Sequence, residues 1–358
     1  MPRFVIVGGG PVGLAAGIEA RLRGAEAVVV ERCGGPVDKA CGEGLMPAGV
    51  AHLARLGAVP AAAASHPIRG IRYIDATGGR KVVVEAPFAN GMGLGVRRLG
   101  LSEALRERAV GLGVELWERT EALGFRADRA GVTLETSGGS VGGDWLIGAD
   151  GLHSQVRKWA RIEVVAGPAR RLGIRRHFPV TPWTDFVEVW WADNVEAYVT
   201  PTGPHRVGVA FLWGGRRGRG DFDTFLAGFP ELAARLGAPE SSIRGAGPFD
   251  VRVSTQASGR VLLVGDAAGY VDALTGEGLA LGFGQAHELV GLCLDGRWAE
   301  WPARWSVITR RHRMFTRGLL QLAARPWLRR LAFRGLAANP WAFRLALNHG
   351  AGRPALTG

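Results

Sequence analysis

Six residues near the N-terminus have the types and spacing of a dinucleotide-binding loop. Gly8-Gly9-Gly10-Pro11-Val12-Gly13 follows a short apolar stretch and precedes a helical pattern that runs to Leu22. Gly8 permits a tight turn, Gly10 leaves the backbone open to a pyrophosphate, and Gly13 allows a helix to pack closely on a strand. The first turn of the helix supplies free N–H groups and a partial positive charge, which suit a phosphate.

An acidic residue stands where the second strand of such a unit ends. Glu31 closes the apolar stretch 27–31 and is followed by Arg32, which we include in the expected nucleotide site. A carboxylate at this position accepts hydrogen bonds from both hydroxyls of an adenosine ribose and repels a 2′-phosphate. A glycine-rich turn without a nucleotide is the alternative interpretation. The strand, the helix and the acid in register favour nucleotide binding.

Two further motifs each follow an apolar strand. They are Gly148-Ala149-Asp150-Gly151-Leu152-His153-Ser154-Gln155-Val156-Arg157 and Val264-Gly265-Asp266-Ala267-Ala268-Gly269. With the N-terminal loop, in this order and spacing, they resemble the flavoprotein monooxygenase superfamily, which includes the para-hydroxybenzoate hydroxylase type and the geranylgeranyl reductases. The resemblance covers about residues 1–295. It implies an α/β fold in which a Rossmann-type FAD-binding domain carries an inserted, mainly antiparallel β-sheet substrate domain and a helical C-terminus. It also implies FAD as cofactor and NAD(P)H as reductant.

The same resemblance implies roles for individual residues of these motifs. Asp266, beside Gly265, is expected to hold a ribityl hydroxyl of FAD, although an aspartate there also suits a helix N-cap. Asp150, beside Gly151, is expected to order the pyrophosphate loop, near the path of NAD(P)H.

An arginine and two glycines complete the cofactor site that the resemblance implies. Arg98 opens a helical pattern and is expected beside FAD, with Arg97 as the alternative. Gly276 and Gly278 begin a later helix, whose N–H groups would face the flavin edge on which negative charge collects upon reduction.

Lys39-Ala40-Cys41-Gly42-Glu43-Gly44-Leu45 resembles the geranylgeranyl reductase branch, in which this segment lies beside the flavin. Cys41 is a candidate proton donor, with a small buried apolar side chain as the alternative role, and Gly42 is expected at the cofactor. Tyr198, in Tyr198-Val199-Thr200-Pro201, stands where that branch has its aromatic substrate wall. The tryptophans of that wall motif are missing here, which argues against a polyprenyl substrate.

Periodicity predicts the elements that must position these residues. We expect helices over 98–112 and from about 277, a hairpin over 68–84 with its turn at Thr77-Gly78-Gly79, and strands over 186–191, 196–200 and 206–212. The FAD-binding domain is expected to comprise 1–67, 95–165 and 255–296. The substrate domain is expected to comprise 68–94 and 166–254, followed by a basic helical region over 297–358.

Positive charge is concentrated at the C-terminus. The net charge is +12, and residues 297–358 hold twelve Arg and one acid, Glu300, which is 12 − 1 = +11. One expected helix has an inward-facing side formed by residues 305, 308, 312, 315, 319 and 322, and arginines at 310, 313 and 317 on another side. A second expected helix has apolar residues at 328, 331, 332 and 336 on one side and arginines at 329, 330 and 334 on the opposite side. We expect peripheral contact with an anionic membrane through 297–358, or packing of both helices on the FAD-binding domain. Charge alone does not indicate nucleic acid.

Composition narrows the remaining possibilities. Three Cys give no disulfide framework, so a cytoplasmic protein is expected, with peripheral membrane contact through its tail as a further option. No apolar stretch is long and uncharged enough to span a bilayer. The eight His show no metal-binding spacing, so no metal is expected. The oligomeric state stays open.

Four functions remain. The first is an FAD-dependent monooxygenase that hydroxylates a hydrophobic, aromatic or polyketide-like or lipid-like molecule. The second, which the Cys41 segment favours, is a flavin-dependent reductase of carbon–carbon double bonds. A halogenase fits less well, because the chain is short and lacks a lysine-bearing loop. A membrane-associated flavin-binding protein without turnover is the fourth.

Overall fold

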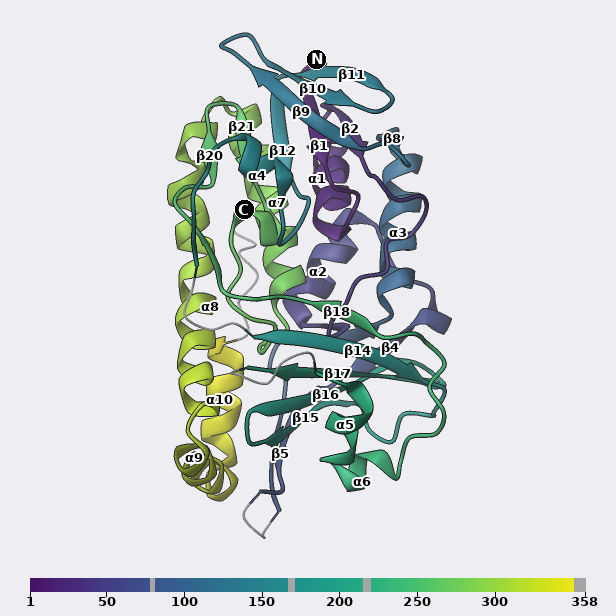
Figure 1. The fold of residues 1–358 in the computed structure, drawn as a ribbon, viewed down its shortest axis with the longest axis vertical. Coiled ribbons are helices and arrows are strands. Elements are labelled where there is room, and N and C mark those ends of the chain that lie inside the picture. The colour runs from purple at the N-terminus through teal and green to yellow at the C-terminus, as the bar shows by residue number, and fades with distance from the viewer. Residues whose placement is uncertain (78–80, 167–170, 215–219, 351–358) are drawn as a thin grey trace.

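A parallel sheet forms one half of the molecule. The computed structural model describes residues 1–77, 81–166, 171–214 and 220–350. The sheet has the order β20-β21-β12-β1-β2-β8, with β20 antiparallel to its neighbour (Figure 1). Its strands are β1 (Arg3–Val7), β2 (Glu26–Val30), β8 (Glu115–Trp117), β12 (Trp145–Gly148), β20 (Ala257–Ser258) and β21 (Val261–Leu263). The central strands are continuous apolar runs because both faces of this sheet are covered.

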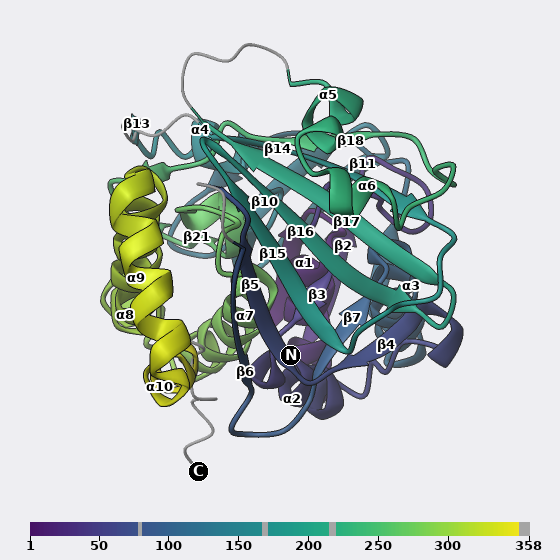
Figure 2. The same ribbon diagram turned by 90° about the horizontal axis from the view of Figure 1, so that it is seen from below.

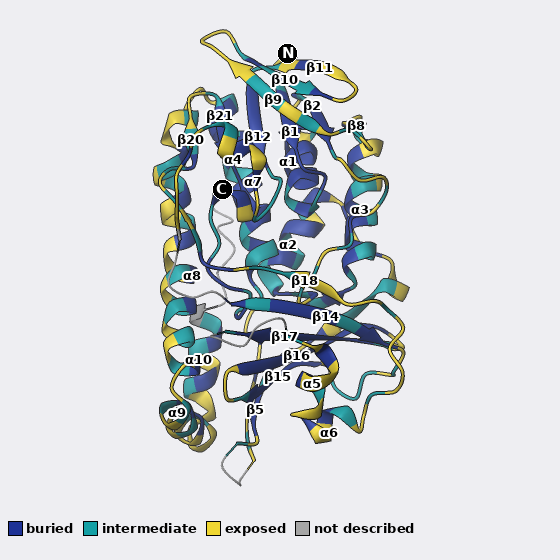
Figure 3. Ribbon diagram, in the orientation of Figure 1, coloured by how far each residue is buried: buried dark blue, intermediate teal, exposed yellow. Residues whose placement is uncertain are grey.

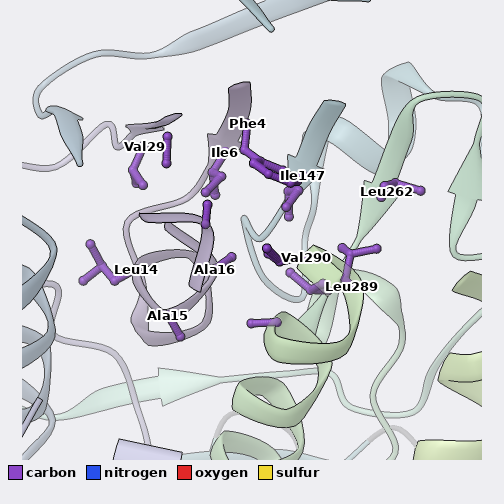
Figure 4. Close-up of a cluster of buried hydrophobic side chains, with 14 of the residues drawn as sticks. Phe4, Ile6, Leu14, Ala15, Ala16, Val29, Ile147, Leu262, Leu289 and Val290 are labelled. Atoms are coloured by element: carbon purple, nitrogen blue, oxygen red, sulfur yellow. The ribbon is translucent and has the colours of Figure 1, made fainter. Parts of the chain in front are cut away.

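Three helices lie together against this sheet. They are α1 (Pro11–Leu22), α3 (Arg98–Gly111) and α7 (Gly278–Leu294), and α1 contacts both of the others. Figure 4 shows Ile147 of the sheet near Val290 of α7, with Ile6 and Val29 further toward α1. On the opposite face, a small antiparallel sheet adds buried side chains to the same core; its strands are β9 (Ala122–Ala127), β10 (Val132–Thr136) and β11 (Gly139–Gly143).

Short elements connect the two halves of the molecule. The helices are α2 (Pro47–Leu56) and α4 (Gln155–Trp159). A three-stranded sheet has the order β3 (Gly44–Leu45), β7 (Gly93–Val96) and β4 (Ser65–Ile68), and a two-stranded sheet pairs β13 (Val164–Ala166) with β19 (Val251–Val253).

A seven-stranded sheet forms the other half, in the order β18-β14-β17-β16-β15-β5-β6 (Figure 2). Its strands are β5 (Gly70–Asp75), β6 (Val82–Pro87), β14 (Leu172–Phe178), β15 (Phe186–Ala192), β16 (Val195–Gly203), β17 (Arg206–Trp213) and β18 (Arg244–Ala246). The expected hairpin and the three expected strands are present, and β5 joins the sheet by parallel pairing with β15. Gly78 and Gly79 of the expected turn lie outside the described residues. The helices α5 (Phe222–Ala227) and α6 (Pro230–Ala233) pack on this sheet through an aromatic cluster.

The C-terminal region is helical, as expected, and its helices are α8 (Trp301–Ala323), α9 (Pro326–Ala338) and α10 (Pro340–Gly350). Helix α8 runs along both halves of the molecule (Figures 1 and 2). Its predicted inner face is confirmed, since Trp305 and His312 are buried. None of the described helices has the length and apolar character that crossing a membrane requires.

The prediction for α9 is wrong at two positions. Arg329, expected in solvent, is fully buried, whereas Leu331, expected to pack inward, is 62% exposed. The reason is the pair of acidic side chains beneath the helix, because Arg329 donates to Asp75 at 2.9 Å and to Asp193 at 3.1 Å. Periodicity cannot reveal a buried ion pair that joins residues 254 positions apart.

Candidate functional site

The dinucleotide loop has the geometry that its glycines require. Gly8 has a φ of +109°, and a Cβ on Gly13 would lie 1.9 Å from the Gly8 carbonyl oxygen. Both glycines therefore serve the turn and the packing of α1 on β1. Gly10 is different, because a Cβ there would meet only the Arg98 guanidinium at 3.7 Å. Gly10 faces an open cavity, together with Pro11 and Val12.

Glu31 lies behind this loop. Its carboxylate accepts hydrogen bonds from the backbone N–H of Gly9 at 2.7 Å and of Cys33 at 2.9 Å. It therefore holds the loop as well as lining a small hollow with Gly9 and Val37. Arg32 is exposed at the start of the following loop. The structure places Glu31 and Arg32 outside the main cavity.

One cavity lies between the parallel sheet and the seven-stranded sheet. Its walls come from segments far apart in the sequence: the dinucleotide loop, residues 39–44, the turn after β21, the start of α7, and the inner face of β5, β15, β16 and β17. It brings together the following predicted residues: Gly10, Pro11, Val12, Cys41, Gly42, Arg98, Gly151, Tyr198, Gly265, Asp266, Gly276 and Gly278.

Asp266 fits a role in holding a polar ligand. Its carboxylate faces the open space of the cavity and has no hydrogen-bond or ion-pair partner among the described residues. Enclosure by the surrounding protein raises the pKa of Asp266, while Arg98 and Lys39 oppose that rise. An N-cap role is not observed, because Val264 is the N-cap of the short helix Gly265–Ala268 and no side chain caps that helix.

The two arginine candidates are separated by the structure. Arg98 is buried and lines the cavity, and its Nε has no partner within the described part of the chain. Arg97 does not line the cavity, and its backbone N–H bonds to Ala64. Arg98 is therefore the better cofactor candidate.

Asp150 lies just behind the cavity wall formed by Ala149 and Gly151. Its Oδ2 accepts from the N–H groups of Gln155 at 2.7 Å and Val156 at 3.1 Å, which fixes the start of α4. Its buried Oδ1 has no partner in the described structure. The geometry supports the expected ordering of the loop and leaves one oxygen for another donor.

Several contacts hold the turn before α7. Tyr198 lines the cavity from β16, and its hydroxyl donates to the Leu274 carbonyl at 2.7 Å. Asp272 accepts from Arg171 at 2.9 Å. Burial raises the pKa of Asp272 to about 6, and Arg171 opposes the shift. These contacts fix the turn over 270–278 against the seven-stranded sheet.

Segment 38–44 is held from the same sheet by a buried network that sequence reasoning missed. Glu43 is 2% exposed, accepts from the Arg98 backbone N–H at 2.8 Å, and lies 2.7 Å from His177 Nε2. Arg175 donates to Asp38 and lines the cavity. The one available signal was the pair of charged residues, Arg175 and His177, within an otherwise strand-like stretch.

Cys41 lies at the cavity wall, in the expected place. Its Sγ accepts from the Glu43 N–H at 3.4 Å, and all three cysteines are free thiols. Burial raises the pKa of the Cys41 thiol; nearby Arg98 opposes this shift and Glu43 adds to it. The side chain therefore carries its proton at neutral pH.

Comparison with known proteins agrees with this geometry. Residues 3–292 match the family described as the FAD binding domain. The chain belongs to this family. Within the FAD binding domain family, the chain is 31% identical over 313 residues to a menaquinone reductase of Mycobacterium tuberculosis, a match that covers 82% of this chain and 76% of the relative. A menaquinone reductase of Mycolicibacterium smegmatis is 28% identical over 332 residues, which are 86% of this chain and 80% of that protein.

Several solved structures share the fold. A flavoprotein/dehydrogenase from Cytophaga hutchinsonii has a TM-score of 0.82 at 16% identity, covering 98% of this chain and 92% of that chain. The tetrameric 2-methyl-3-hydroxypyridine-5-carboxylic acid oxygenase has a TM-score of 0.75 at 21% identity. The match covers 99% of this chain and 97% of that chain. At these identities the likeness shows the fold alone.

The residues present fit FAD, and the protein is an FAD-dependent oxidoreductase of this family. The open backbone at Gly10, the unpartnered Asp266 carboxylate and the Arg98 guanidinium are the groups that would hold the cofactor. When bound, FAD supplies transfer of a hydride or of single electrons. Within the described residues, no group of three or more His, Cys, Asp or Glu side chains is placed to hold a metal ion.

Proposed function

We propose that this protein is a flavin-dependent reductase of a lipophilic, menaquinone-like molecule, with NAD(P)H as the source of electrons. The match to the two menaquinone reductases carries the proposal, because it extends over more than four-fifths of the chain.

The cavity supports a lipophilic substrate. Beyond the cofactor candidates, its walls are mostly apolar, and they include Ile71, Val187, Val189 and Leu212 of the seven-stranded sheet. Such a wall favours an apolar ligand by burial and offers little to a charged one. The cavity also reaches Phe315 of α8 and so extends toward the C-terminal helices.

Reduction of a carbon–carbon double bond requires a hydride equivalent on one carbon and a proton on the other. Cys41 supports this chemistry, because its thiol faces the cavity and its raised pKa keeps the proton in place until a strong base forms nearby. Glu43 and His177 lie behind it and hold the segment, because the Glu43 backbone N–H donates to Cys41 Sγ and the Glu43 carboxylate contacts His177.

The decisive experiment is anaerobic turnover. The holoprotein, reduced with NADH or NADPH in excess, is incubated with menaquinone that has an unsaturated side chain, and the product is analysed by mass spectrometry after reoxidation of the ring by air. We expect a stable gain of two hydrogens. A menaquinone with a saturated side chain serves as control and should show no stable gain. An unchanged mass for both substrates contradicts double-bond reduction.

Hydroxylation is the second candidate, because the three sequence motifs resemble those of the flavoprotein monooxygenase superfamily. It predicts a gain of one oxygen that requires O2, together with oxygen consumption that depends on substrate. The same incubation, repeated in air, therefore separates the two reactions.

A further inference from the structure

The last two helices share a short pattern whose apolar side chains point outward. Pro-Trp-x-x-Arg-Leu-Ala occurs at 326–332 in α9 and again at 340–346 in α10. The two tryptophans and two leucines of this pattern are exposed: Trp327 66%, Leu331 62%, Trp341 68% and Leu345 51%. A Trp and a Leu four positions apart lie on the same side of a helix, so each helix presents an apolar stripe. Exposed apolar side chains that form a stripe on each helix mark an interaction surface.

The opposite sides of both helices are fixed to the protein. Phe333 of α9 and Phe343 of α10 are buried, and each packs against Tyr73 of the seven-stranded sheet. The centroid of the Tyr73 ring lies 5.7 Å from that of Phe333 and 5.0 Å from that of Phe343. Arg329 adds its buried ion pairs to Asp75 and Asp193. Each helix therefore buries one face against the protein and leaves its Trp and Leu stripe on another, exposed face (Figure 3).

Charge identifies the partner. Residues 301–350 contain ten Arg and no Lys, Asp or Glu. Arg334 of α9 and Arg344 of α10 are exposed. A surface hollow is lined by Trp341 with Arg311 and Arg344. Tryptophan rings favour the boundary between lipid head groups and acyl chains, and arginines beside them attract anionic head groups.

We propose that the outward faces of α9 and α10, with Arg311 of α8, dock the protein on an anionic lipid bilayer. We call this set the docking surface, and it comprises Arg311, Trp327, Leu331, Arg334, Trp341 and Arg344. Tryptophan and leucine enter the interfacial layer, and the arginines bind lipid phosphates. A nucleic acid would not require the outward Trp and Leu side chains, and an acidic protein partner would not require two separate stripes of this kind.

The docking surface is connected to the cavity through the same helices. Leu347 of α10 and Phe315 of α8 line the cavity from the inside, while Trp341 and Arg311 belong to the docking surface on the outside. A lipophilic substrate dissolved in the bilayer would then have a short path to the cavity; this consequence rests on the proposed function, whereas docking itself does not.

Flotation of the full-length holoprotein with vesicles tests the proposal. The vesicles are phosphatidylcholine alone or phosphatidylcholine with about one-third phosphatidylglycerol, at low and at high salt. We expect binding to the anionic vesicles that weakens with salt. Trp327→Ser/Trp341→Ser and Arg334→Gln/Arg344→Gln should each reduce the bound fraction, the arginine pair by roughly tenfold or more in affinity. Val59→Ser/Leu123→Ser and Arg129→Gln/Arg235→Gln, at exposed positions elsewhere, are the matched controls and should bind like wild type.

Three results would overturn the proposal. The first is that the intact protein floats with neither the neutral nor the anionic vesicles. The second is equal binding by the docking-surface variants and their controls. The third is self-association that the tryptophan variants abolish, which would assign the surface to a second copy of this chain. Turnover of a detergent-dispersed menaquinone is measured in parallel, so that loss of docking and loss of reductase activity are recorded separately.

Discussion

At the scale of single residues, we expect cofactor binding to depend on Asp266, whose carboxylate has no partner among the described residues. We expect Asp266→Ala to weaken FAD binding by roughly tenfold to a hundredfold, because a hydrogen bond to a charged group in an enclosed site is lost. The ratio of flavin to protein absorbance after purification, and titration of the apoprotein with FAD, measure the effect. Asp223→Ala, on an exposed side chain remote from the cavity, is the control. A variant that retains full flavin content would remove Asp266 from the site.

Cys41 is the second residue whose role can be isolated. We expect Cys41→Ala to keep its flavin and to lower kcat by about a hundredfold, since a thiol that donates a proton in the rate-limiting step contributes about this much. The pH dependence of kcat should lose its alkaline limb, because the raised pKa of the thiol sets that limb. Cys33→Ala, at an exposed thiol, should behave like wild type. Equal kcat in both variants would leave Cys41 with a packing role.

At the scale of elements, α2 carries a histidine whose titration affects the fold. His52 is buried against α7, and burial, with Arg55 next, lowers its pKa to about 4. In the unfolded chain the histidine gains a proton near pH 6.5, whereas in the folded chain it stays neutral until about pH 4. The unfolded state therefore binds more protons in this window, and the free energy of unfolding falls as pH is lowered.

We expect this histidine to account for a loss of about 3 kcal/mol in the free energy of unfolding between pH 7 and pH 4. Urea denaturation at several pH values measures it. His52→Gln should flatten the dependence over that range, while His205→Gln, at an exposed position, should leave it unchanged. A dependence that is identical in wild type and His52→Gln would contradict the assignment.

At the scale of the whole molecule, a buried arginine adds ion pairs to the aromatic contacts that join the C-terminal helices to the seven-stranded sheet. Replacing Arg329 with Leu leaves the Asp75 carboxylate buried without its cation, so we expect the free energy of unfolding to fall by about 3–5 kcal/mol. Cleavage by a protease between α8 and α9 should also become faster. Arg334→Leu, at an exposed arginine of the same helix, is the control for both measurements. Equal stability and cleavage in the two variants would contradict the anchoring role.

The architecture also explains how the cavity is enclosed. Segment 38–44 is bonded to the sheet through Arg175 and His177, and the turn before α7 is bonded to it through Tyr198 and Arg171. Both cofactor-side segments are therefore positioned by the seven-stranded sheet. We expect disruption of that sheet to affect flavin binding, even though the dinucleotide loop lies elsewhere.

The amino-acid sequence by itself determined the elements and the motifs. The dinucleotide loop, the two aspartate motifs and the strands of the second sheet were predicted with bounds close to those observed, because glycine geometry and periodicity are local properties of a chain. Cys41, Arg98, Tyr198 and Asp266 were named through the resemblance of their motifs to a known family, and the structure places all four at the cavity.

Only the tertiary structure decided which distant charges meet. Glu43 pairs with His177 across 134 positions, and Arg329 pairs with Asp75 across 254. Such pairs form because charged groups that leave water require a partner, and the partner is chosen by how the elements pack and not by their sequence spacing. The outward direction of Trp327 and Trp341 was decided in the same way, since the face that a helix buries depends on what lies beneath it.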